Sequence, residues 1–98
     1  MALIQASNPG QSVSEALAWQ IDRVEQTDPF SSGYAIPLTE TPIDADALLV
    51  WSKGECLVTD DWDYNAGTNE VEILFSGDPA TDTDDGVWVF FVQYPYAT

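Results

Sequence analysis

The strongest hydrophobic pattern in the chain is the run from Asp85 to Tyr94, near its carboxyl end. This run is an unbroken series of β-branched and aromatic residues between a turn signal and Pro95, and it is short for a buried helix. We predict a strand. Alternation places its side chains on two faces: Val87, Val89 and Phe91 on one, and Trp88, Phe90, Val92 and Tyr94 on the other. Because both faces are apolar, we expect a second sheet, a helix or another subunit to cover each of them.

A helical pattern lies upstream. Ser12 and Glu15 have the spacing of a capping box, and apolar residues recur at helical intervals at Val13, Leu17, Ile21 and Val24. The pattern predicts one amphipathic helix from Ser12 to about Gln26. Trp19 lies off the apolar stripe, so the helix has a second surface to bury. It either covers one face of the sheet or packs on another subunit, and amphipathicity alone does not decide between the two.

The first eleven residues predict an arm. They begin with an apolar tip that contains Leu3 and Ile4 and pass into a turn-forming Asn-Pro-Gly cluster. Arms of this kind either fray or dock on a neighbouring subunit, and the apolar pair favours docking.

From residue 34 onward the signals are those of strands. We predict strands over Tyr34–Leu38, Ala47–Trp51, Glu55–Val58 and Glu70–Phe75, in addition to the carboxyl-terminal one. Pro37 indicates an edge strand, and residues 52–54 indicate a hairpin turn in which Gly54 supplies a positive φ. Residues 60–64 read as a polar corner, and residues 76–86 as a long loop.

These elements predict a mainly β chain with two parts. Residues 1–33 would form the arm and helix, used for attachment, and residues 34–98 would form a small β-sandwich or barrel-like domain. A length of 98 residues suits a single domain with a modest core, which oligomerisation would help to stabilise.

The charge of the chain limits which partners it can bind. The formal net charge is -15, with Arg23 and Lys53 as the only basic residues, so direct binding to nucleic acid phosphates is not expected. Most carboxylates must be solvated, which suits a basic partner, a salty medium or simple solubility. The chain is nevertheless 45% hydrophobic and 12% aromatic, a composition that argues against wholesale disorder.

The residues give little sign of chemistry or of a membrane. The chain contains no histidine, and we expect its single cysteine, Cys56, to be a buried apolar residue rather than a nucleophile. The longest apolar run is about half of a membrane span, and we see no signal peptide, so we expect synthesis in the cytoplasm. We therefore expect no enzyme activity and no cofactor.

Two acidic clusters are candidate sites. Residues 82–86 do not fit the spacing of an EF-hand calcium loop, and we expect a solvated loop, although a looser calcium site shared with Asp78 stays open. Asp60, Asp61 and Asp63 form the second cluster, but acid-base catalysis would need their convergence in space. No metal site is predicted.

The order of features from Ile36 to Tyr94, about three-fifths of the chain, resembles a small β-module of tail-fibre and other virion structural proteins of tailed bacteriophages. The matching segments are Leu38-Thr39-Glu40-Thr41-Pro42, Leu48-Leu49-Val50-Trp51, Lys53-Gly54-Glu55-Cys56-Leu57, Asp63-Tyr64, Val71-Glu72-Ile73-Leu74-Phe75, Pro79 and Gly86-Val87-Trp88-Val89-Phe90. Two departures are a long acidic loop over residues 78–85 and a Lys-Gly turn where the module commonly has Asn-Gly.

The resemblance implies a virion structural protein. We expect a small capsid decoration or cement protein, ahead of a tail or head fibre protein, with partners that include further copies of itself, for example in a trimer, and the major capsid protein. The residues expected at the interface are Leu3, Ile4, Val13, Leu17, Trp19 and Ile21, with Trp88 and Phe90 in a subunit or core contact. An alternative drawn from the charge is an acidic DNA mimic that inhibits a host nucleic-acid-binding protein.

Overall fold

Two antiparallel sheets make up most of the protein. The computed structural model describes residues 17–97, and of Leu17 it describes only the backbone. The strands are β1 (Leu17–Gln26), β2 (Tyr34–Pro37), β3 (Leu49–Ser52), β4 (Glu55–Cys56), β5 (Trp62–Asn65), β6 (Glu70–Ile73) and β7 (Trp88–Ala97). The short helical elements are η2 (Ala45–Ala47), η3 (Thr59–Asp61) and α1 (Pro79–Asp82). The chain is therefore mainly β, as its sequence predicts.

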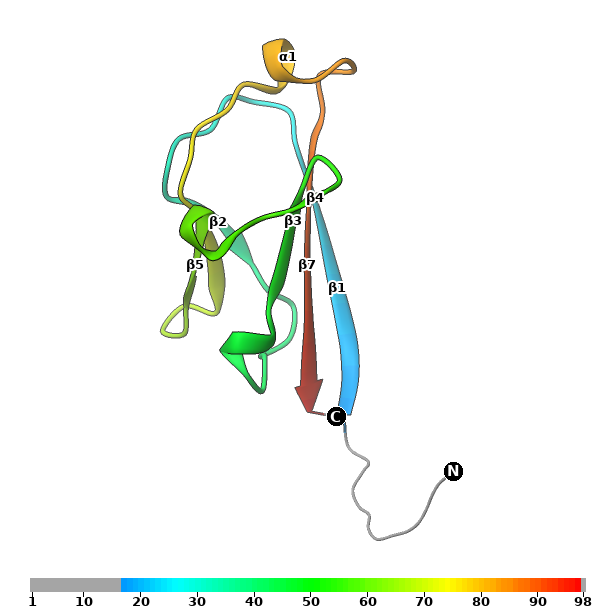
Figure 1. Cartoon of the computed structure of the whole chain (residues 1–98), viewed down its shortest axis with the longest axis vertical. Helices are drawn as coiled ribbons and strands as arrows, with labels where there is room; N and C mark the ends of the chain where they lie inside the picture. Colours follow the sequence, from blue (N-terminus) through cyan, green and yellow to red (C-terminus); the bar gives the residue numbers. More distant parts are fainter. Residues whose placement is uncertain (1–16, 98) are drawn as a thin grey trace, which may run out of the picture.

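Strand β7 is central to the first sheet, whose strand order is β1-β7-β3-β4. The predicted carboxyl-terminal strand is confirmed, although it runs three residues further, to Ala97. Its two faces also divide as expected: Trp88, Phe90, Val92 and Tyr94 are buried, and the side chains between them are partly exposed. Figure 1 shows β7 alongside β1 over its whole length.

The predicted helix over residues 12–26 is wrong within the described residues. Residues 17–26 form β1, which pairs with β7 in ten register positions from Leu17↔Ala97 to Gln26↔Trp88. The physical reason is that β7 needs a partner along its entire length, and a ten-residue backbone ladder outweighs the helix propensity of this segment. Val13 and the predicted arm lie outside the described residues.

The predicted division at residue 33 does not follow the sheets. Because β1 and β7 are neighbours in one sheet, residues 17–26 belong to the same structural unit as the carboxyl-terminal strand. The β-domain therefore begins no later than Leu17, and not at Tyr34.

The second sheet has the strand order β2-β6-β5. Strand β2 is an edge strand, as Pro37 predicts, because proline has no N–H for a second neighbour. The predicted strand over 70–75 is confirmed as β6, although it ends at Ile73. The predicted polar corner is instead partly a strand, β5, whose Tyr64 pairs with Val71 of β6.

The predicted hairpin between residues 47 and 58 is confirmed with shorter strands, β3 and β4. Its turn residues, Lys53 and Gly54, both have positive φ values, of 50° and 82°. This is the geometry of a two-residue turn whose twist matches that of the strands, and Lys53 occupies a position that asparagine or glycine usually takes.

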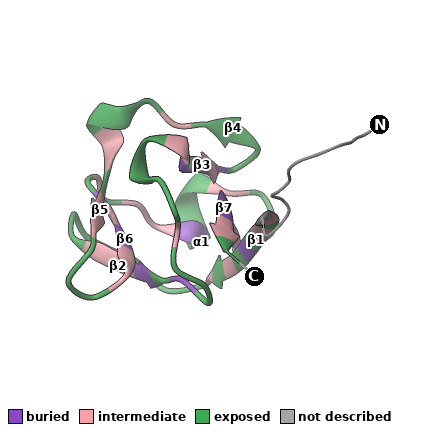
Figure 2. Ribbon diagram, turned by 90° about the horizontal axis from the view of Figure 1, so that it is seen from below, coloured by how far each residue is buried: buried purple, intermediate pink, exposed green. Residues whose placement is uncertain are grey.

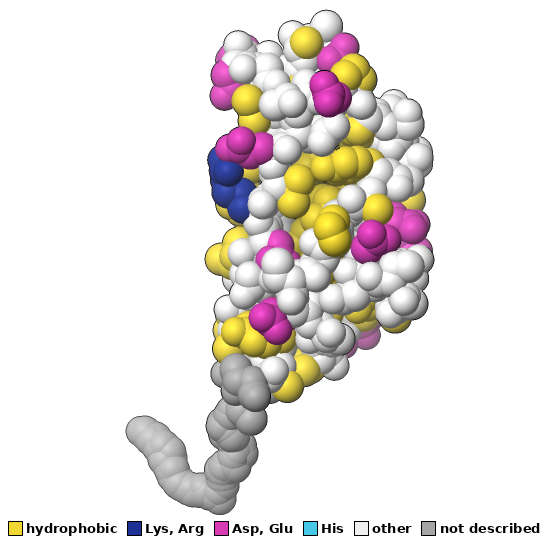
Figure 3. All heavy atoms as spheres, turned by 180° about the vertical axis from the view of Figure 1, so that it is seen from behind, with side chains coloured by type: hydrophobic (Ala, Val, Ile, Leu, Met, Phe, Trp, Pro, Cys, Tyr) yellow, Lys and Arg dark blue, Asp and Glu magenta, His cyan; other side chains and the backbone are white. Residues whose placement is uncertain are grey.

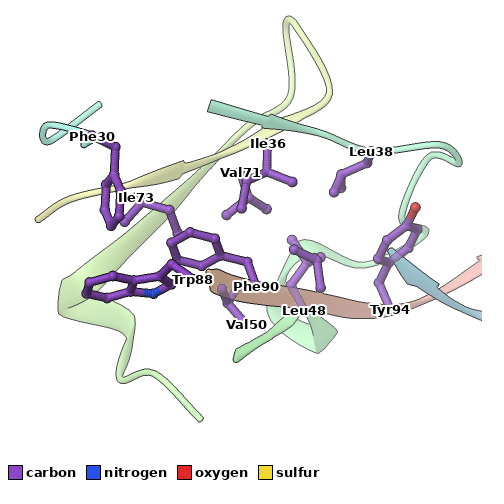
Figure 4. Packing of buried hydrophobic residues seen from close by; sticks show 11 residues of the cluster. Phe30, Ile36, Leu38, Leu48, Val50, Val71, Ile73, Trp88, Phe90 and Tyr94 are labelled. Carbon is purple, nitrogen blue, oxygen red and sulfur yellow. The ribbon is translucent and has the colours of Figure 1, made fainter. Parts of the chain in front are cut away.

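The core lies between the two sheets. Figure 2 shows β2, β5 and β6 on one side and β1, β3 and β7 on the other, with buried residues in between. In Figure 4, Ile36, Val71 and Ile73 point from the second sheet toward Val50 and Phe90 of the first. The whole buried cluster is Phe30, Ile36, Leu38, Leu48, Val50, Val71, Ile73, Trp88, Phe90, Val92 and Tyr94.

Phe30 closes the core at the end where α1 lies. Its ring makes an edge contact with Trp88, with centroids 4.9 Å apart, and its backbone exchanges two hydrogen bonds with Gly77. Trp88 in turn donates from Nε1 to the Ser52 hydroxyl at 2.8 Å. The connection that follows β1 is therefore bound to both sheets rather than exposed as a linker.

Candidate interaction surface

The outward face of the first sheet is apolar and uncovered within the described chain. Successive side chains of a strand point to opposite faces, so the residues that alternate with the buried ones point outward from β1, β7 and β3. We define the apolar face by these outward hydrophobic residues: Trp19, Ile21, Leu49, Trp51, Val89 and Phe91. Trp19 is 61% exposed, Ile21 58% and Leu49 42%. Contiguous exposed apolar surface of this kind marks a binding site.

The apolar face contains a hollow. Its volume is about 260 Å³, and it is lined by Ile21, Trp51, Gly54, Phe91 and Gln93. Cross-strand pairing explains the arrangement, because Trp51 lies opposite Phe91 and Ile21 lies opposite Gln93. Gly54 leaves space at one end, since no side chain projects there. The lining is almost wholly hydrophobic, so the hollow suits an apolar side chain.

Charge along β1 is balanced, whereas Asp82, Asp84 and Asp85 border this side of the molecule next to Val89. Arg23 and Glu25, which follow Trp19 and Ile21 on the same face of β1, form an ion pair of 2.7 Å, and the Arg23 guanidinium lies 6.0 Å from the Phe91 ring. Figure 3 shows this side in profile at the left, where basic and hydrophobic side chains lie together. The other basic residue, Lys53, lies in the β3–β4 turn of the same sheet.

The outward face of the second sheet has the opposite character. Asp63 of β5 lies directly opposite Glu72 of β6, and Glu70 follows on the same face. Within residues 17–97 no basic side chain pairs with these carboxylates, and the right side of Figure 3 accordingly carries Asp and Glu side chains. Like charges placed opposite one another are mildly destabilising in a sheet, so this face is one that remains solvated.

The predicted interface residues divide into three groups. Trp19 and Ile21 are exposed on the apolar face, although on a strand rather than on a helix. Trp88 is 6% exposed and Phe90 is fully buried, so both contribute to the core of a single chain. Leu3, Ile4 and Val13 lie outside the described residues, and Leu17 begins β1.

Sequence reasoning missed the other members of the apolar face. Leu49 and Trp51 were predicted in a strand without an assigned face, and Val89 and Phe91 were not named as interface residues. The available signal was the two-sided pattern of β7: its inward face fills the core, so its outward face is left over.

A buried carboxylate joins the first sheet to the segment that follows β2. Asp22, 7% exposed, accepts hydrogen bonds from the Tyr94 hydroxyl at 2.6 Å, the Thr39 hydroxyl at 2.7 Å and the Thr39 N–H at 3.1 Å. Gln20 Nε2 donates a fourth bond at 2.9 Å. Burial alone would raise the pKa of the Asp22 carboxyl, but these donors together hold that pKa below its ordinary value of 3.8. Asp22 is therefore ionised, and its contacts are structural.

The acidic segment before β7 does not gather metal ligands. Asp78 caps α1 by accepting from the Ala80 N–H, and Lys53 Nζ donates to the Asp82 carbonyl at 3.2 Å while lying 4.4 Å from the Trp88 ring. Within residues 17–97, no three side chains of the metal-binding types come together. The two acidic clusters therefore offer no described ligand set.

Cys56 is exposed, which corrects the prediction of a buried thiol: it lies in the short edge strand β4, where no described residue covers it. Between Leu17 and Ala97, no helix has the length and apolar character needed to cross a membrane.

Comparisons with known proteins add no relationship: no family model, no curated protein and no solved structure matches this chain.

Proposed function

We propose that this chain is a structural protein of a tailed-phage virion, most simply a small capsid decoration or cement protein. The observation that carries the proposal is the contrast between the two outer faces of the protein. Within residues 17–97, one is apolar, nearly neutral along β1 and uncovered, and the other is acidic and solvated.

Such a contrast suits a protein that is held on a larger particle. The apolar face gains free energy when a neighbouring subunit covers it, at about 25 cal/mol for each Å² removed from water. The acidic face, with Asp63 and Glu72 opposite one another, favours solvent over a protein contact. Because its two outer faces differ, such a subunit docks with its apolar face toward the particle and its acidic face toward solvent.

The mainly β content of the chain is compatible with the proposal. Of the segments that carry the resemblance to the phage module, those over residues 48–57, 63–64, 71–75 and 86–90 include residues of β3, β4, β5, β6 and β7, whereas residues 38–42 and Pro79 lie outside the strands. We propose that the two sheets form a small β-sandwich of that kind, with Trp88 and Phe90 in its core and Trp19 and Ile21 at its docking surface.

The mechanism would be clamping by mass action. A protein that binds the assembled shell but not the disassembled subunits stabilises the shell by about 2.7 kcal/mol per site at a concentration of 100 times Kd. This requires no catalytic group and no cofactor. Its partners would be the major capsid protein and further copies of the chain, and its location the virion.

The test is to locate the protein on purified particles. Antibodies against the chain should detect it in gradient-purified phage particles, and immunogold labelling should decorate the capsid. Particles lacking the protein should lose their DNA at a lower temperature than normal particles. Labelling of the tail or of head fibres would replace the cement assignment by a fibre or appendage protein, and absence from particles would refute a virion role.

A second candidate function is an acidic DNA mimic. It is favoured by the row of carboxylates on the second sheet, Asp63, Glu70 and Glu72, which would attract a basic cleft. If the protein is absent from particles, it should instead form a salt-sensitive complex with a host nuclease or polymerase. Replacing these three acids by their amides would then abolish that complex and leave the fold intact.

A further inference from the structure

The neutrality of the apolar face bears on which partner can occupy it. Of the side chains that point outward from β1, β3 and β7 between residues 18 and 97, only Glu25 is acidic, and Arg23 neutralises it. The full chain has 17 acidic residues and a net charge of -15. A basic partner would therefore be drawn to the second sheet and not to this face.

A second copy of the chain is the partner that a neutral, apolar face suits best. Two molecules of charge -15 repel each other over most of their surface, and the repulsion is strongest where unpaired carboxylates meet. Away from Val89, which borders a hollow lined by Asp82, Asp84 and Asp85, the apolar face lets two copies touch without bringing like charges together, because Glu25, its one acid on β1, β3 and β7, is already paired. Two copies would therefore associate through the apolar face, where the repulsion between them is weakest.

The shape of the face is self-complementary. Trp19 projects from β1 with 61% of its surface exposed, and the hollow lies beside it, beginning at Ile21 two residues along the same strand. The hollow has a volume of about 260 Å³, which is the space of roughly nine waters at ~30 Å³ each and comparable to one aromatic side chain. A projection and a hollow on the same face are what a two-fold contact needs, since each copy supplies both.

The length of the strands limits the area of the face. Strands β1 and β7 have ten residues each and extend about 34 Å at ~3.4 Å per residue, whereas β3 has four residues and β4 two. With strands ~4.8 Å apart, the flat footprint is roughly 400 Å² before side-chain relief is added. Stable interfaces bury about 800 Å² of accessible surface per partner, so projecting side chains such as Trp19 must supply the rest.

We propose that two copies of the chain pack through their apolar faces about a two-fold axis, with Trp19 of each copy inserted into the hollow of the other. The inference deepens the proposed function, and rests on it in taking the apolar face as the assembly surface. It makes the dimer the unit that assembles and Trp19 its anchor, in keeping with the prominence of tryptophan among residues that dominate binding.

The first test is the molar mass of the full chain in solution, measured by sedimentation velocity over a wide range of concentration and at two salt concentrations. We expect a dimer that tightens at high salt, because salt screens the repulsion between the acidic surfaces more than it affects apolar contact. W19K should raise the dissociation constant by at least about 30-fold. Since Trp19 is exposed, the circular dichroism of the variant should remain normal, and its melting temperature should equal that of wild type at a concentration where wild type is monomeric.

V58K is the matched control, because Val58 is 64% exposed but lies after β4, outside the apolar face. It should leave the dissociation constant unchanged. A monomer at all concentrations, a trimer, or a dimer that W19K does not weaken relative to V58K would each overturn the proposal.

A second test addresses the insertion itself. W19K alone places a lysine in an apolar hollow, and Q93E alone places a carboxylate there, so each variant should be monomeric. Mixed together, they should form a heterodimer in which the new lysine of one chain meets the new glutamate of the other. Failure of affinity-tagged W19K to capture Q93E, or equal capture of V58E, would overturn the inserted geometry.

The outcome is separable from that of the proposed function. A chain that is monomeric in solution but present on particles would refute the dimer alone. A Trp19-dependent dimer that is absent from particles would refute the virion role alone.

Discussion

Replacing Asp22 by asparagine should destabilise the protein by about 2–3 kcal/mol while barely changing its shape. The Asp22 carboxylate accepts four hydrogen bonds, and Thr39 donates two of them, from its hydroxyl and its backbone N–H. An asparagine can keep its oxygen toward the Thr39 hydroxyl, but its amide nitrogen then faces the Thr39 N–H. Two donors cannot pair, so this substitution leaves a part-buried N–H without its acceptor.

The magnitude follows from these contacts. A buried polar group without a partner costs about 1–3 kcal/mol, and hydrogen bonds to a charged acceptor are stronger than those to a neutral one by roughly 1 kcal/mol. The Tyr94 hydroxyl limits the loss, because it also accepts from the Glu40 N–H and can accept from the new amide. Against a total stability of about 5–15 kcal/mol, such a change is easily measured.

The pH dependence has a defined sign. Because the pKa of Asp22 lies below 3.8 in the folded protein, the unfolded state binds this proton first as the pH falls. The contribution of Asp22 to stability is therefore complete above about pH 5 and is lost as the pH falls below 3.8 toward the folded pKa. The difference in free energy of unfolding between wild type and D22N should be constant from pH 7 to 5 and should shrink in more acidic solution.

Urea unfolding, followed by tryptophan fluorescence at a series of pH values, measures this difference directly. D84N is the matched control, because Asp84 is an exposed carboxylate of the loop before β7, and it should change stability by less than about 0.5 kcal/mol. If D22N were as stable as D84N at pH 7, or if its deficit persisted undiminished at pH 2.5, the role assigned to the Asp22 network would be refuted.

Three further predictions concern packing and exposure. G77A should lower stability by about 1–3 kcal/mol in thermal unfolding, because a Cβ would lie 2.5 Å from a Trp88 ring atom, whereas G67A, at a turn, should cost less. S52A removes the acceptor of the Trp88 indole N–H, so it should cost about 1–2 kcal/mol in urea unfolding; no loss would mean that this bond is dispensable. Cys56 should react with Ellman's reagent in the folded protein, and protection until denaturant is added would contradict its exposure.

The sequence predicts the local part of this fold well. The alternation of Val71 and Ile73, the run of β7 and the glycine of the β3–β4 turn each act within a few residues, and each is found where expected. Pro37 likewise indicates an edge strand, because a missing N–H has the same consequence in any sheet.

Residues 17–26 show that a prediction from neighbouring residues alone can give the wrong secondary structure. Leu17, Ile21 and Val24 have helical spacing, but in β1 Ile21 points outward while Val24 packs against the core. The deciding interaction is the ladder to β7, about seventy residues away in sequence, and no window around β1 contains it. In the strand Trp19 and Ile21 are nevertheless exposed, so their predicted role in attachment stays a prediction.

The candidate surface was accessible to sequence reasoning only in outline. A two-sided apolar β7 implies that something covers Val89 and Phe91, yet the pattern does not say which strands flank them. The contributions of Leu49 and Trp51 depend on the pairing of β3 with β7, and the acidic second face depends on the pairing of β5 with β6. Both pairings depend on the register between strands, which is visible only in the folded sheets.

The pairing of Leu17 with Ala97 has a mechanical consequence. The first residue of β1 and the last residue of β7 lie side by side at one end of the protein, so a force that pulls them apart acts along the hydrogen bonds between the strands. Such a load falls on one pair of bonds at a time, and the two strands open like a zipper. A load applied between Leu17 and the opposite end of β7 would instead shear all ten positions together. The direction in which this protein is tethered would thus decide whether it yields to weak forces or resists strong ones.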